Sequence, residues 1–374
     1  MLLESYGFTY ETDKQALFKF KSQVSEDKKA VLSSWNSSFP LCSWTGVTCG
    51  RKHKRVIGLD LRELQLGGVI SPSIGNLSFL TSLDLTDNSF GGTIPQEVGN
   101  LFRLRYLFVG LNFLKGRIPA SLFNCSRLLA LELYVNQFQQ GVPPGILGSL
   151  TELVVLDLGR TNLKGKIPAS LGNLTSLTYL SFAENSLEGR IPYELARLTQ
   201  LVSFQLTSNN FSGVFPPVVY NLSSLESLYI SNNSFSGSLR HDLGNLLPNL
   251  QEFYMENNYF SGPIPSTLPN ISSLQRFGME HNSLTGGIPP SFGKVRNLQL
   301  LSLHSNSLGS HSFRDLDFLG ALTNCTQLNA LSVANNMLGG DLPTSIANLS
   351  RNLIDLTFEK NFISGSIPHD IGIS

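Results

Sequence analysis

The residues that could perform catalysis form no recognisable constellation in this chain of 374 residues. The six histidines make no H-E-x-x-H motif and no cluster with cysteine, so zinc-type metal binding has no support. Gly293-Lys294 is followed by valine and lacks the spaced upstream glycine of a phosphate-binding loop. No G-x-S-x-G element occurs, and the paired carboxylates are expected only at exposed strand positions. The sequence therefore predicts a protein that is not an enzyme and holds no cofactor or metal.

The charge balance also excludes some partners. Lysine and arginine number 27, as do aspartate and glutamate, whereas nucleic acid or an anionic membrane attracts a net positive protein. No run of about 18 apolar residues exists, so no membrane span is expected. The residues Met1–Tyr10 lack the basic and apolar regions of an intact signal peptide. We therefore expect a chain that binds no nucleic acid and contains no membrane span.

The cysteines and the glycosylation sequons indicate the secretory pathway. Cys42 and Cys49 form a close pair, whereas Cys125 and Cys325 are far apart and are expected to be buried thiols that act as small hydrophobic side chains. Ten N-x-S/T sequons accompany the pair, and we expect a majority of them to carry glycans. The sequon asparagines are Asn36, Asn76, Asn124, Asn173, Asn210, Asn221, Asn232, Asn270, Asn324 and Asn348.

The main feature of the sequence is an internal repeat built on L-x-L-x-x-N. Successive registers lie 24 or 25 residues apart, with one step of 30 residues between Asn306 and Asn336. Two registers replace the asparagine, one by Leu64 and one by Thr161. The repeated asparagines are Asn88, Asn112, Asn136, Asn185, Asn209, Asn233, Asn258, Asn282, Asn306, Asn336 and Asn361. Registers at one constant spacing predict a solenoid.

Each L-x-L predicts a short strand whose leucines enter the core while the x positions face outward. One unit cannot bury its apolar face alone, so stacked repeats must share a continuous core beneath a curved parallel sheet. The asparagine amide is expected to satisfy buried backbone groups at the turn after each strand. An L-x-G-x-I-P element follows, as at Leu114–Pro119, with a glycine for a tight turn and a proline that restricts the outer segment. Residues 56–374 are therefore predicted to hold about thirteen repeats, the last of them incomplete.

The L-x-G-x-I-P element on this repeat length resembles the plant leucine-rich-repeat receptor-like kinases, over nearly the whole chain from Glu11 onward. Glu11–Trp35, Gly68–Leu80, Asn324–Leu328 and Gly365–Gly372 are most similar to the subfamily that contains the receptor for bacterial elongation factor Tu. The resemblance implies a leucine-rich-repeat solenoid, an α/β horseshoe or superhelix with short parallel strands on its concave face.

The same resemblance implies a role at the cell surface. In this family a peptide or protein ligand, including microbial ones, binds the extracellular repeats and brings in a shorter leucine-rich-repeat co-receptor kinase, which starts immune or developmental signalling. The family's membrane helix and Ser/Thr kinase domain have no counterpart in this sequence. The chain is thus expected to correspond to the ligand-reading part of such a receptor.

Residues 11–50 are similar to the helical amino-terminal cap of the family. Thr12–Gln15 fits a capping box, in which the threonine and glutamine side chains satisfy free N–H groups at the start of a helix. The apolar face of that helix is predicted to contain Leu17, Phe20 and Val24. A second short helix is expected at Leu32–Trp35. The cap would cover the apolar edge of the first repeat.

Three further segments have structural interpretations. The family resemblance implies a cap disulfide between Cys42 and Cys49. Arg51–Arg55 is a basic run that we interpret as a solvated link between the cap and the first strand, without a function of its own. The longer repeat at Gly309–Gly320 is expected to hold a loop or an extended helix on the outer side.

A ligand is expected on the concave face, where the x positions of each strand and the turn after it are presented. Aromatic residues there are typical interface anchors, and acidic residues outnumber basic ones, which favours an extended, net-basic peptide. The predicted ligand-binding residues are Tyr106, Phe108, Tyr134, Asp157, Arg160, Tyr179, Glu184, Tyr229, Tyr254, Glu256, Glu280, His281 and His304. Glu132, Gln205, Glu252, Glu359 and Lys360 occupy similar positions.

Two classes of function are compatible with these features. The first is the ligand-sensing ectodomain of a plant pattern-recognition receptor kinase at the plasma membrane. The second is a secreted, kinase-less repeat protein of the apoplast that acts as a decoy or an enzyme inhibitor, and a truncated gene product is a third possibility. The sequence names no ligand.

Overall fold

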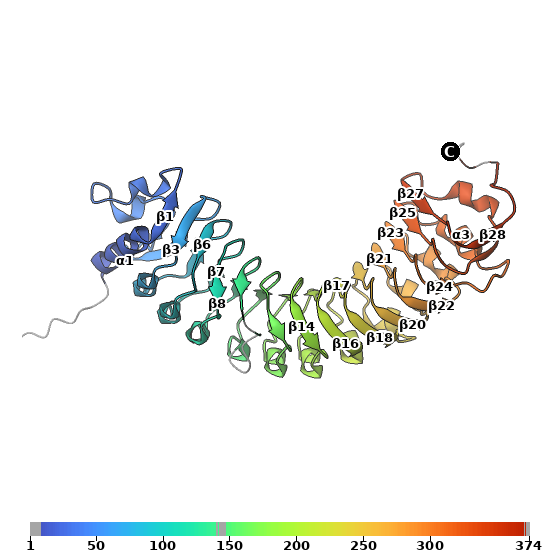
Figure 1. Cartoon of the computed structure of the whole chain (residues 1–374), viewed down its shortest axis with the longest axis horizontal. Coiled ribbons are helices and arrows are strands. Elements are labelled where there is room, and N and C mark those ends of the chain that lie inside the picture. Colours follow the sequence, from blue (N-terminus) through green and yellow to red (C-terminus); the bar gives the residue numbers. More distant parts are fainter. Residues whose placement is uncertain (1–8, 140, 142–146, 370, 372–374) are drawn as a thin grey trace, which may run out of the picture. The chain divides into compact units, whose positions relative to one another are not determined.

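The protein is described by a computed structural model over residues 9–139, 141, 147–369 and 371. The chain divides into two compact units, residues 1–187 and 188–374, and each is a leucine-rich-repeat solenoid as predicted. In each unit short parallel strands line one side of the stack and short helices line the other, as Figure 1 shows. Leucine, isoleucine and phenylalanine side chains fill the space between these two layers.

The first unit begins with the helix α1, Tyr10–Ser22. Its N-cap is Thr9, whose hydroxyl accepts from the Thr12 N–H while the Thr12 hydroxyl closes the capping box, so the predicted cap at Thr12 is wrong by three residues. Gln15 instead donates to Glu11. Leu17 and Phe20 are buried as predicted. Val24 is not on the helix, because α1 ends at Ser22 and Val24 begins the strand β1, Val24–Asp27.

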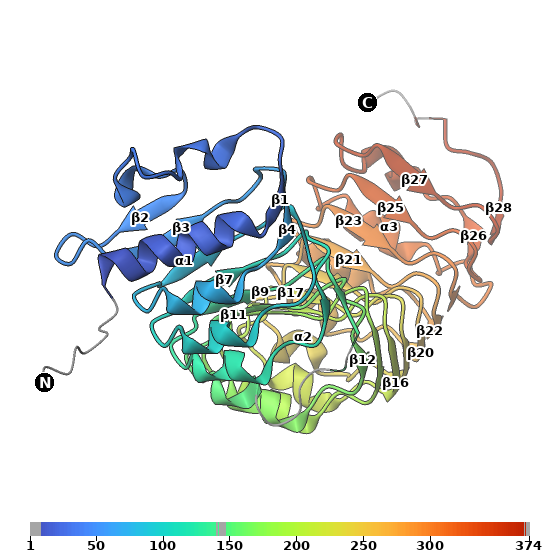
Figure 2. The same ribbon diagram turned by 60° about the vertical axis from the view of Figure 1, so that its left-hand side comes forward.

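Short helices and one strand complete the cap, which Figure 2 shows from the side. They are η1 (Val31–Ser34), η2 (Leu41–Ser43) and β2 (Val47–Cys49). The expected disulfide joins Cys42 to Cys49. Trp35 and Trp44 are fully buried and stack with ring centroids 5.6 Å apart. β1 and β2 pair antiparallel with β4 (Leu66–Val69) and β3 (Val56–Asp60), so the cap covers the first repeat by extending its strands as well as by packing a helix against it.

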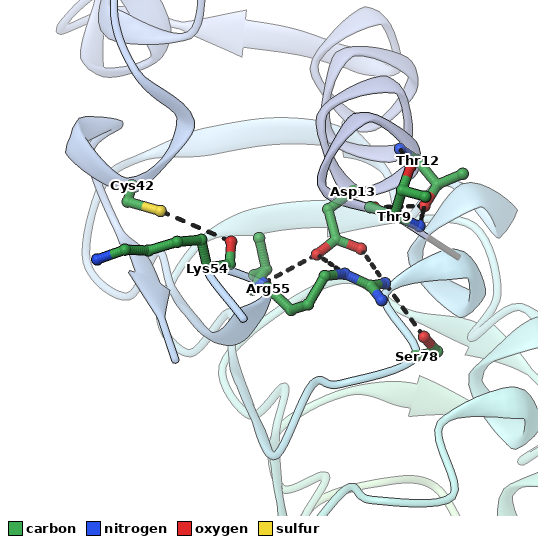
Figure 3. A network of polar contacts seen from close by, with 8 residues as sticks. Thr9, Thr12, Asp13, Cys42, Lys54, Arg55 and Ser78 are labelled. Carbon is green, nitrogen blue, oxygen red and sulfur yellow. Dashed lines mark hydrogen bonds and ion pairs between the residues drawn. The ribbon is translucent and has the colours of Figure 1, made fainter. Parts of the chain in front are cut away.

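A buried ion pair joins the cap to the first repeat, as Figure 3 shows. The Arg55 guanidinium donates to both carboxylate oxygens of Asp13, with Nη2–Oδ1 and Nε–Oδ2 distances of 2.7 and 2.8 Å, and the Val56 N–H donates to Oδ2 at 2.9 Å. Asp13 is 0% exposed and Arg55 only 5%. The prediction of a solvated link at Arg51–Arg55 is therefore wrong for Arg55, whose charge faces the α1 carboxylate across the cap.

The remaining elements of residues 1–187 repeat one pattern. The parallel strands of the main sheet, which follow β3, are β5 (Ser82–Asp84), β7 (Tyr106–Phe108), β9 (Ala130–Glu132), β11 (Val155–Asp157) and β13 (Tyr179–Ser181). The shorter strands beside it are β6 (Ser89–Gly91), β8 (Lys115–Gly116), β10 (Gln137–Phe138), β12 (Lys164–Gly165) and β14 (Ser186–Gly189). The outer helices are η3 (Pro72–Asn76), η4 (Gln96–Asn100), η5 (Ala120–Asn124), η6 (Leu147–Ser149) and η7 (Ala169–Asn173).

Residues 188–374 continue the same pattern. The strands of the main sheet are β15 (Ser203–Gln205), β17 (Ser227–Tyr229), β19 (Glu252–Tyr254), β21 (Arg276–Gly278), β23 (Leu300–Ser302), β25 (Ala330–Ser332) and β27 (Asp355–Thr357). The shorter strands are β16 (Asn210–Val214), β18 (Ser234–Ser238), β20 (Tyr259–Pro263), β22 (Ser283–Gly286), β24 (Ser307–Leu308), β26 (Gly339–Asp341) and β28 (Phe362–Ser364). The outer helices are η8 (Tyr193–Arg197), η9 (Pro217–Asn221), α2 (Leu243–Leu246), η10 (Leu268–Asn270), η11 (Pro290–Lys294), α3 (Asp317–Leu322) and η12 (Thr344–Asn348).

The repeated asparagines satisfy buried backbone groups at the turns, as predicted, and they also form a ladder of hydrogen bonds between neighbouring repeats. The Asn112 carbonyl oxygen accepts from Phe90 N–H at 2.9 Å, and its amide nitrogen donates to Leu85 O at 2.9 Å, so both bonds reach into the preceding repeat. The same arrangement occurs at Asn88, Asn136, Asn185, Asn233, Asn258, Asn282, Asn306, Asn336 and Asn361. Thr161, which replaces one asparagine, donates its hydroxyl to Leu158 O.

Other predicted details can be compared with the fold. Gly92 and Gly116 of the L-x-G-x-I-P elements have left-handed backbones, with φ of 73° and 78°. Cys125 and Cys325 are buried free thiols. The longer repeat holds α3, which is the extended helix that was one of the two expectations. No helix in the described part of the chain is long and apolar enough to cross a bilayer. The predicted incomplete last repeat falls partly outside the described residues, which end at residue 371.

Candidate functional site

The candidate site is the outward face of the main sheet, here called the exposed sheet face. In each repeat it is formed by the first and third residues of the main-sheet strand. It also includes the two residues that directly precede the ladder position. Strand register sets equivalent positions of neighbouring repeats side by side: Tyr229 pairs with Tyr254, and Tyr254 with Gly278. Ligand contacts would therefore be organised in rows that run across the repeats.

In residues 1–187 this face brings together most of the predicted ligand residues of that unit. Tyr106 and Phe108 lie on β7 with ring centroids 6.1 Å apart. Tyr134 follows β9, and its ring covers Gly110, where an added Cβ would lie 2.5 Å from the Tyr134 Cε1 atom. Tyr179 on β13 donates its hydroxyl to Asp157 Oδ2 at 3.4 Å. These aromatic rings all lie on the exposed sheet face of this unit.

The carboxylates on this face are half-buried, which corrects the expectation of exposed strand positions. Glu132 and Asp157 are paired neighbours in the sheet. Burial raises the pKa of Glu132, and the charges of Asp157 and Asp84 raise it further. Burial likewise raises the pKa of Asp157, although the Gly159 N–H, 2.9 Å from Oδ1, opposes the shift. Burial also raises the pKa of Tyr179 to about 12. The face is thus acidic and partly desolvated.

Three of the predicted ligand residues occupy the left-handed position of the turn that follows the strand. Arg160, Glu184 and His281 have left-handed backbones, with φ between 51° and 53°. Each directly precedes a ladder position, where the chain must turn back toward the helices. Arg160 and Glu184 form an exposed ion pair, with Nε and Oε2 3.0 Å apart, so these two side chains contact each other at the rim of the face.

In residues 188–374 the exposed sheet face has an aromatic platform. The Tyr229 and Tyr254 rings stack in parallel, with centroids 5.5 Å apart and planes 7° apart. Tyr229 donates its hydroxyl to Glu252. Burial, followed by that hydrogen bond, raises the pKa of Tyr229 to about 12. Arg276 lies 4.0 Å from the Glu252 carboxylate, so the platform has a charged margin.

Beside the platform lie the other four predicted residues of this unit. Glu256 and Glu280 occupy equivalent positions of neighbouring repeats, and each has a carboxylate oxygen that is buried and lacks a hydrogen-bond partner among the described residues. Burial raises the pKa of Glu256, and the Glu280 charge adds to the shift. The His281 and His304 rings meet edge to face at a centroid distance of 4.9 Å. The structure therefore brings these predicted residues together within each unit.

Some residues of the face were missed from the sequence. Gly278 lies in the row of Tyr229 and Tyr254, and Ser231 lies in the row of Glu256 and Glu280. Neither has a side chain that a search for aromatic or charged positions would select. Aligning the strands row by row, as the register does, would have placed both of them inside the candidate site.

The predicted sequons lie mostly away from this face. Six of their asparagines are the last residues of outer helices, and Asn324 lies two residues after α3; these seven side chains are exposed. The six are Asn76, Asn124, Asn173, Asn221, Asn270 and Asn348. Asn210 is exposed on β16, and half-buried Asn36 lies in the cap, where its amide donates to Ser33 O. Asn232 is in the turn beside Glu256, with its amide 3.4 Å from the Ser208 hydroxyl.

The exposed sheet face presents groups that are suited to binding a polypeptide. No three His, Cys, Asp or Glu side chains of the described residues gather closely enough to hold a metal ion. The described face offers stacked aromatic rings, half-buried carboxylates and exposed backbone turns, which are the groups that anchor an extended polypeptide.

Comparison with known families supports this architecture. The model of the leucine-rich-repeat N-terminal domain matches residues 11–50. The leucine-rich-repeat model matches residues 79–101, 152–174, 176–198, 224–246, 249–271 and 273–295. These matches cover the cap and repeats in both units.

Individual proteins are similar over most of the chain. The LRR receptor-like serine/threonine-protein kinase EFR of Arabidopsis thaliana is 69% identical over 98% of this chain, which spans 35% of the length of that relative. The crystal structure of PEPR1–AtPEP1 is 30% identical, with a TM-score of 0.77 over 97% of this chain and 57% of that one. The Arabidopsis receptor kinase HAESA, in complex with the peptide hormone IDA and the co-receptor SERK1, is 27% identical, with a TM-score of 0.68 over 97% of this chain and 76% of that one. The chain belongs to the family of plant leucine-rich-repeat receptor kinases and corresponds to their leucine-rich-repeat ectodomain.

Proposed function

We propose that this chain is the extracellular ligand-sensing region of a plant pattern-recognition receptor kinase. Its ligand is a peptide or protein segment, net basic and of microbial origin, bound in extended form along the exposed sheet face. Binding at the outer side of the plasma membrane recruits a shorter leucine-rich-repeat co-receptor kinase and starts immune signalling. Similarity to EFR supports the immune role, and the peptide and co-receptor in the HAESA complex support the mode of assembly.

The observation that carries this proposal is the composition of the exposed sheet face. Stacked Tyr229 and Tyr254 provide rigid aromatic area, which is the type of side chain that dominates binding energy at interfaces. Half-buried Glu132, Asp157 and Glu256 supply negative charge in a partly desolvated setting, which favours a basic partner. Seven of the ten sequons lie at the outer helices, so glycans there would leave this face accessible.

The test is direct binding by the secreted, glycosylated chain. The probes are synthetic basic microbial peptides, including the amino-terminal segment of bacterial elongation factor Tu, measured by isothermal titration calorimetry. We expect a Kd in the micromolar range or tighter. Tyr229→Ala and Tyr254→Ala should each weaken binding about 30-fold, equivalent to about 2 kcal/mol for a central aromatic anchor.

The matched control is Tyr193→Ala. Tyr193 is 70% exposed, but it lies on the outer helix η8, so its removal should leave the affinity unchanged. Absence of binding by a folded, monomeric sample would reject these ligands. Equal loss of affinity in all three variants would reject the exposed sheet face as the site.

A further inference from the structure

The row of residues that contains the tyrosine platform is interrupted by a glycine. Tyr229, Tyr254, Gly278 and Ser302 are sheet neighbours in that order. At Gly278 the exposed sheet face therefore lacks a side chain. A Cβ placed there would lie 3.0 Å from Tyr254 Cδ1, 3.2 Å from Glu280 Oε2 and 3.4 Å from Glu256 Oε2. The gap over Gly278 is thus narrow, because one aromatic ring and two carboxylates already crowd the position that a Cβ would take.

The polar groups around this gap are not satisfied by the described part of the protein. Oε2 of Glu256 and of Glu280 is buried without a hydrogen-bond partner there, and so is the Ser231 hydroxyl oxygen. Ser231 is only 1% exposed. Its hydroxyl faces the Glu256 carboxyl closely enough to lower the pKa of that group, against the larger effect of burial, without reaching hydrogen-bond geometry. Buried polar atoms without partners are rare, since each is costly to the folded state.

Two other carboxylates of the exposed sheet face, Asp157 and Glu252, differ from this pair. Asp157 accepts hydrogen bonds from Gly159 N–H and the Tyr179 hydroxyl. Glu252 accepts from Tyr229 and lies near Arg276. Within the described residues no group donates to the buried Oε2 atoms of Glu256 and Glu280 in hydrogen-bond geometry, and the charges of the two carboxylates oppose each other. A positively charged group with several hydrogen-bond donors would provide both carboxylates with a hydrogen bond and an opposite charge.

The chemistry of the gap selects among cations. All three unsatisfied groups can accept hydrogen bonds, so the occupant must carry several N–H donors and a positive charge, as a lysine ammonium or an arginine guanidinium does. The Tyr254 ring beside the gap suits the apolar stem of such a side chain or a cation–π contact. A metal ion is less suited, because the described residues contain no group of three ligands.

We infer that Glu256, Glu280 and Ser231 line a specificity subsite, with Gly278 as its floor, for one lysine or arginine side chain of a bound peptide. This inference rests on the proposed function, because it assumes a peptide on the exposed sheet face. It adds a single basic residue that the ligand must place beside the tyrosine platform. A bound side chain enters this subsite by turning the two flexible glutamates aside, because their Oε2 atoms lie 3.2 and 3.4 Å from the position of a Cβ on Gly278.

The experiment uses the intact secreted chain and a displayed library of random dodecapeptides. Peptides are selected on the wild-type protein, and a peptide is retained if Tyr229→Ala weakens its binding. The retained peptides are therefore those that bind at the exposed sheet face. Each is then measured against Glu256→Gln/Glu280→Gln and against Gly278→Ala, which fills the gap. The control is Glu97→Gln, because Glu97 is exposed on the outer helix η4, away from the exposed sheet face. Circular dichroism melting confirms folding.

The two variants should fold. Glutamine keeps the shape of glutamate and removes the repulsion between two buried charges. Gly278 does not have a left-handed backbone, and its added Cβ meets two movable glutamate oxygens and, at 3.0 Å, the Tyr254 ring, which must shift by a few tenths of an ångström. We expect selected peptides to share a lysine or arginine at one position. Their affinity should fall about tenfold or more in either variant, as for loss of a charge-assisted bond, and should be unchanged in Glu97→Gln.

A double-mutant cycle links the subsite to the peptide. Replacing the shared basic residue by glutamine should weaken binding to the wild type but not to Glu256→Gln/Glu280→Gln. Peptides that need Tyr229 but are insensitive to both variants would overturn the subsite and leave the proposed function intact. Failure to select any peptide that depends on Tyr229 would overturn both. A preference for guanidinium over ammonium in matched arginine and lysine peptides would identify the cation.

Discussion

Replacement of Asp13 by alanine should detach the cap from the first repeat. In the native protein Asp13 accepts two hydrogen bonds from Arg55 and one from Val56 N–H, and both charged side chains are almost fully buried. The substitution removes the buried carboxylate to which Arg55 donates two hydrogen bonds, and breaking a buried ion pair in this way typically costs about 3–5 kcal/mol. Loss of the bond to the Val56 N–H adds to this cost. We therefore expect the cap to lose about 4 kcal/mol of stability.

The assay is urea unfolding followed by tryptophan fluorescence. The chain has two tryptophans, Trp35 and Trp44, and both are stacked inside the cap, so their emission reports cap unfolding specifically. With a urea dependence of about 2 kcal/mol per molar, the midpoint should fall by about 2 M. Lys28→Ala is the control, because it removes an exposed ion pair with Glu26 and should change stability by less than about 1 kcal/mol.

A double variant distinguishes the contribution of the ion pair to the stability of the cap from the contribution of side-chain packing. Asp13→Leu with Arg55→Met replaces both charges by apolar groups and should regain most of the loss, because the uncompensated charge is gone. If Asp13→Ala shifts the midpoint no more than Lys28→Ala does, the reasoning is refuted and the ion pair contributes nothing beyond a surface contact. If the double variant is as unstable as Asp13→Ala, the destabilisation comes from lost packing around these side chains and not from the broken ion pair.

Three other perturbations should follow from the same structure. Replacing Cys42 and Cys49 by serine should destabilise the cap by about 2.5 kcal/mol, the loop-closure entropy of so short a ring, measured by the same fluorescence assay. Because burial raises the folded-state pKa of Glu256 above its ordinary 4.5, this group stabilises the protein at low pH and loses that contribution as the pH rises through the folded pKa. The urea midpoint of the carboxy-terminal unit, followed by circular dichroism, should therefore fall less between about pH 4.5 and 7 in Glu256→Gln than in the wild type. Burial raises the pKa of Cys125 to about 11, so its alkylation by iodoacetamide at about pH 8 should require denaturant, and labelling at equal rates with and without denaturant would contradict its buried position.

The solenoid could be predicted from the sequence because each repeated residue has a local and periodic role. Leu107 points inward for the reason that any alternate strand residue does, and Asn112 must satisfy backbone groups wherever the chain leaves a strand. Repetition makes such weak local preferences visible many times over. The disulfide between Cys42 and Cys49 is expected from the resemblance of the cap to the family, and the structure contains it.

The cap could be predicted less fully because its contacts are not periodic. Arg55 pairs with Asp13 across 42 residues, and a basic run gives no indication of which member turns inward. The helix began at Tyr10 rather than after Thr12 because two threonines three residues apart compete for the same capping role. The antiparallel strands β1 and β2 depend on edges presented by the first repeats, which a local pattern does not contain.

The exposed sheet face could be predicted from the sequence less fully than the solenoid and more fully than the cap. Which residues point outward follows from the strand period, but whether they are satisfied depends on the equivalent positions of the neighbouring repeats. Asp157 has its donors in its own and the next repeat, whereas Glu256 and Glu280 share a gap left by a glycine in the row of Tyr254. The core leucines and ladder asparagines hold the repeats together without help from these outward side chains. Substitutions at Glu256, Glu280 or Gly278 can therefore alter recognition while the solenoid stays folded, so for these positions a loss of affinity without a loss of stability is evidence of ligand contact.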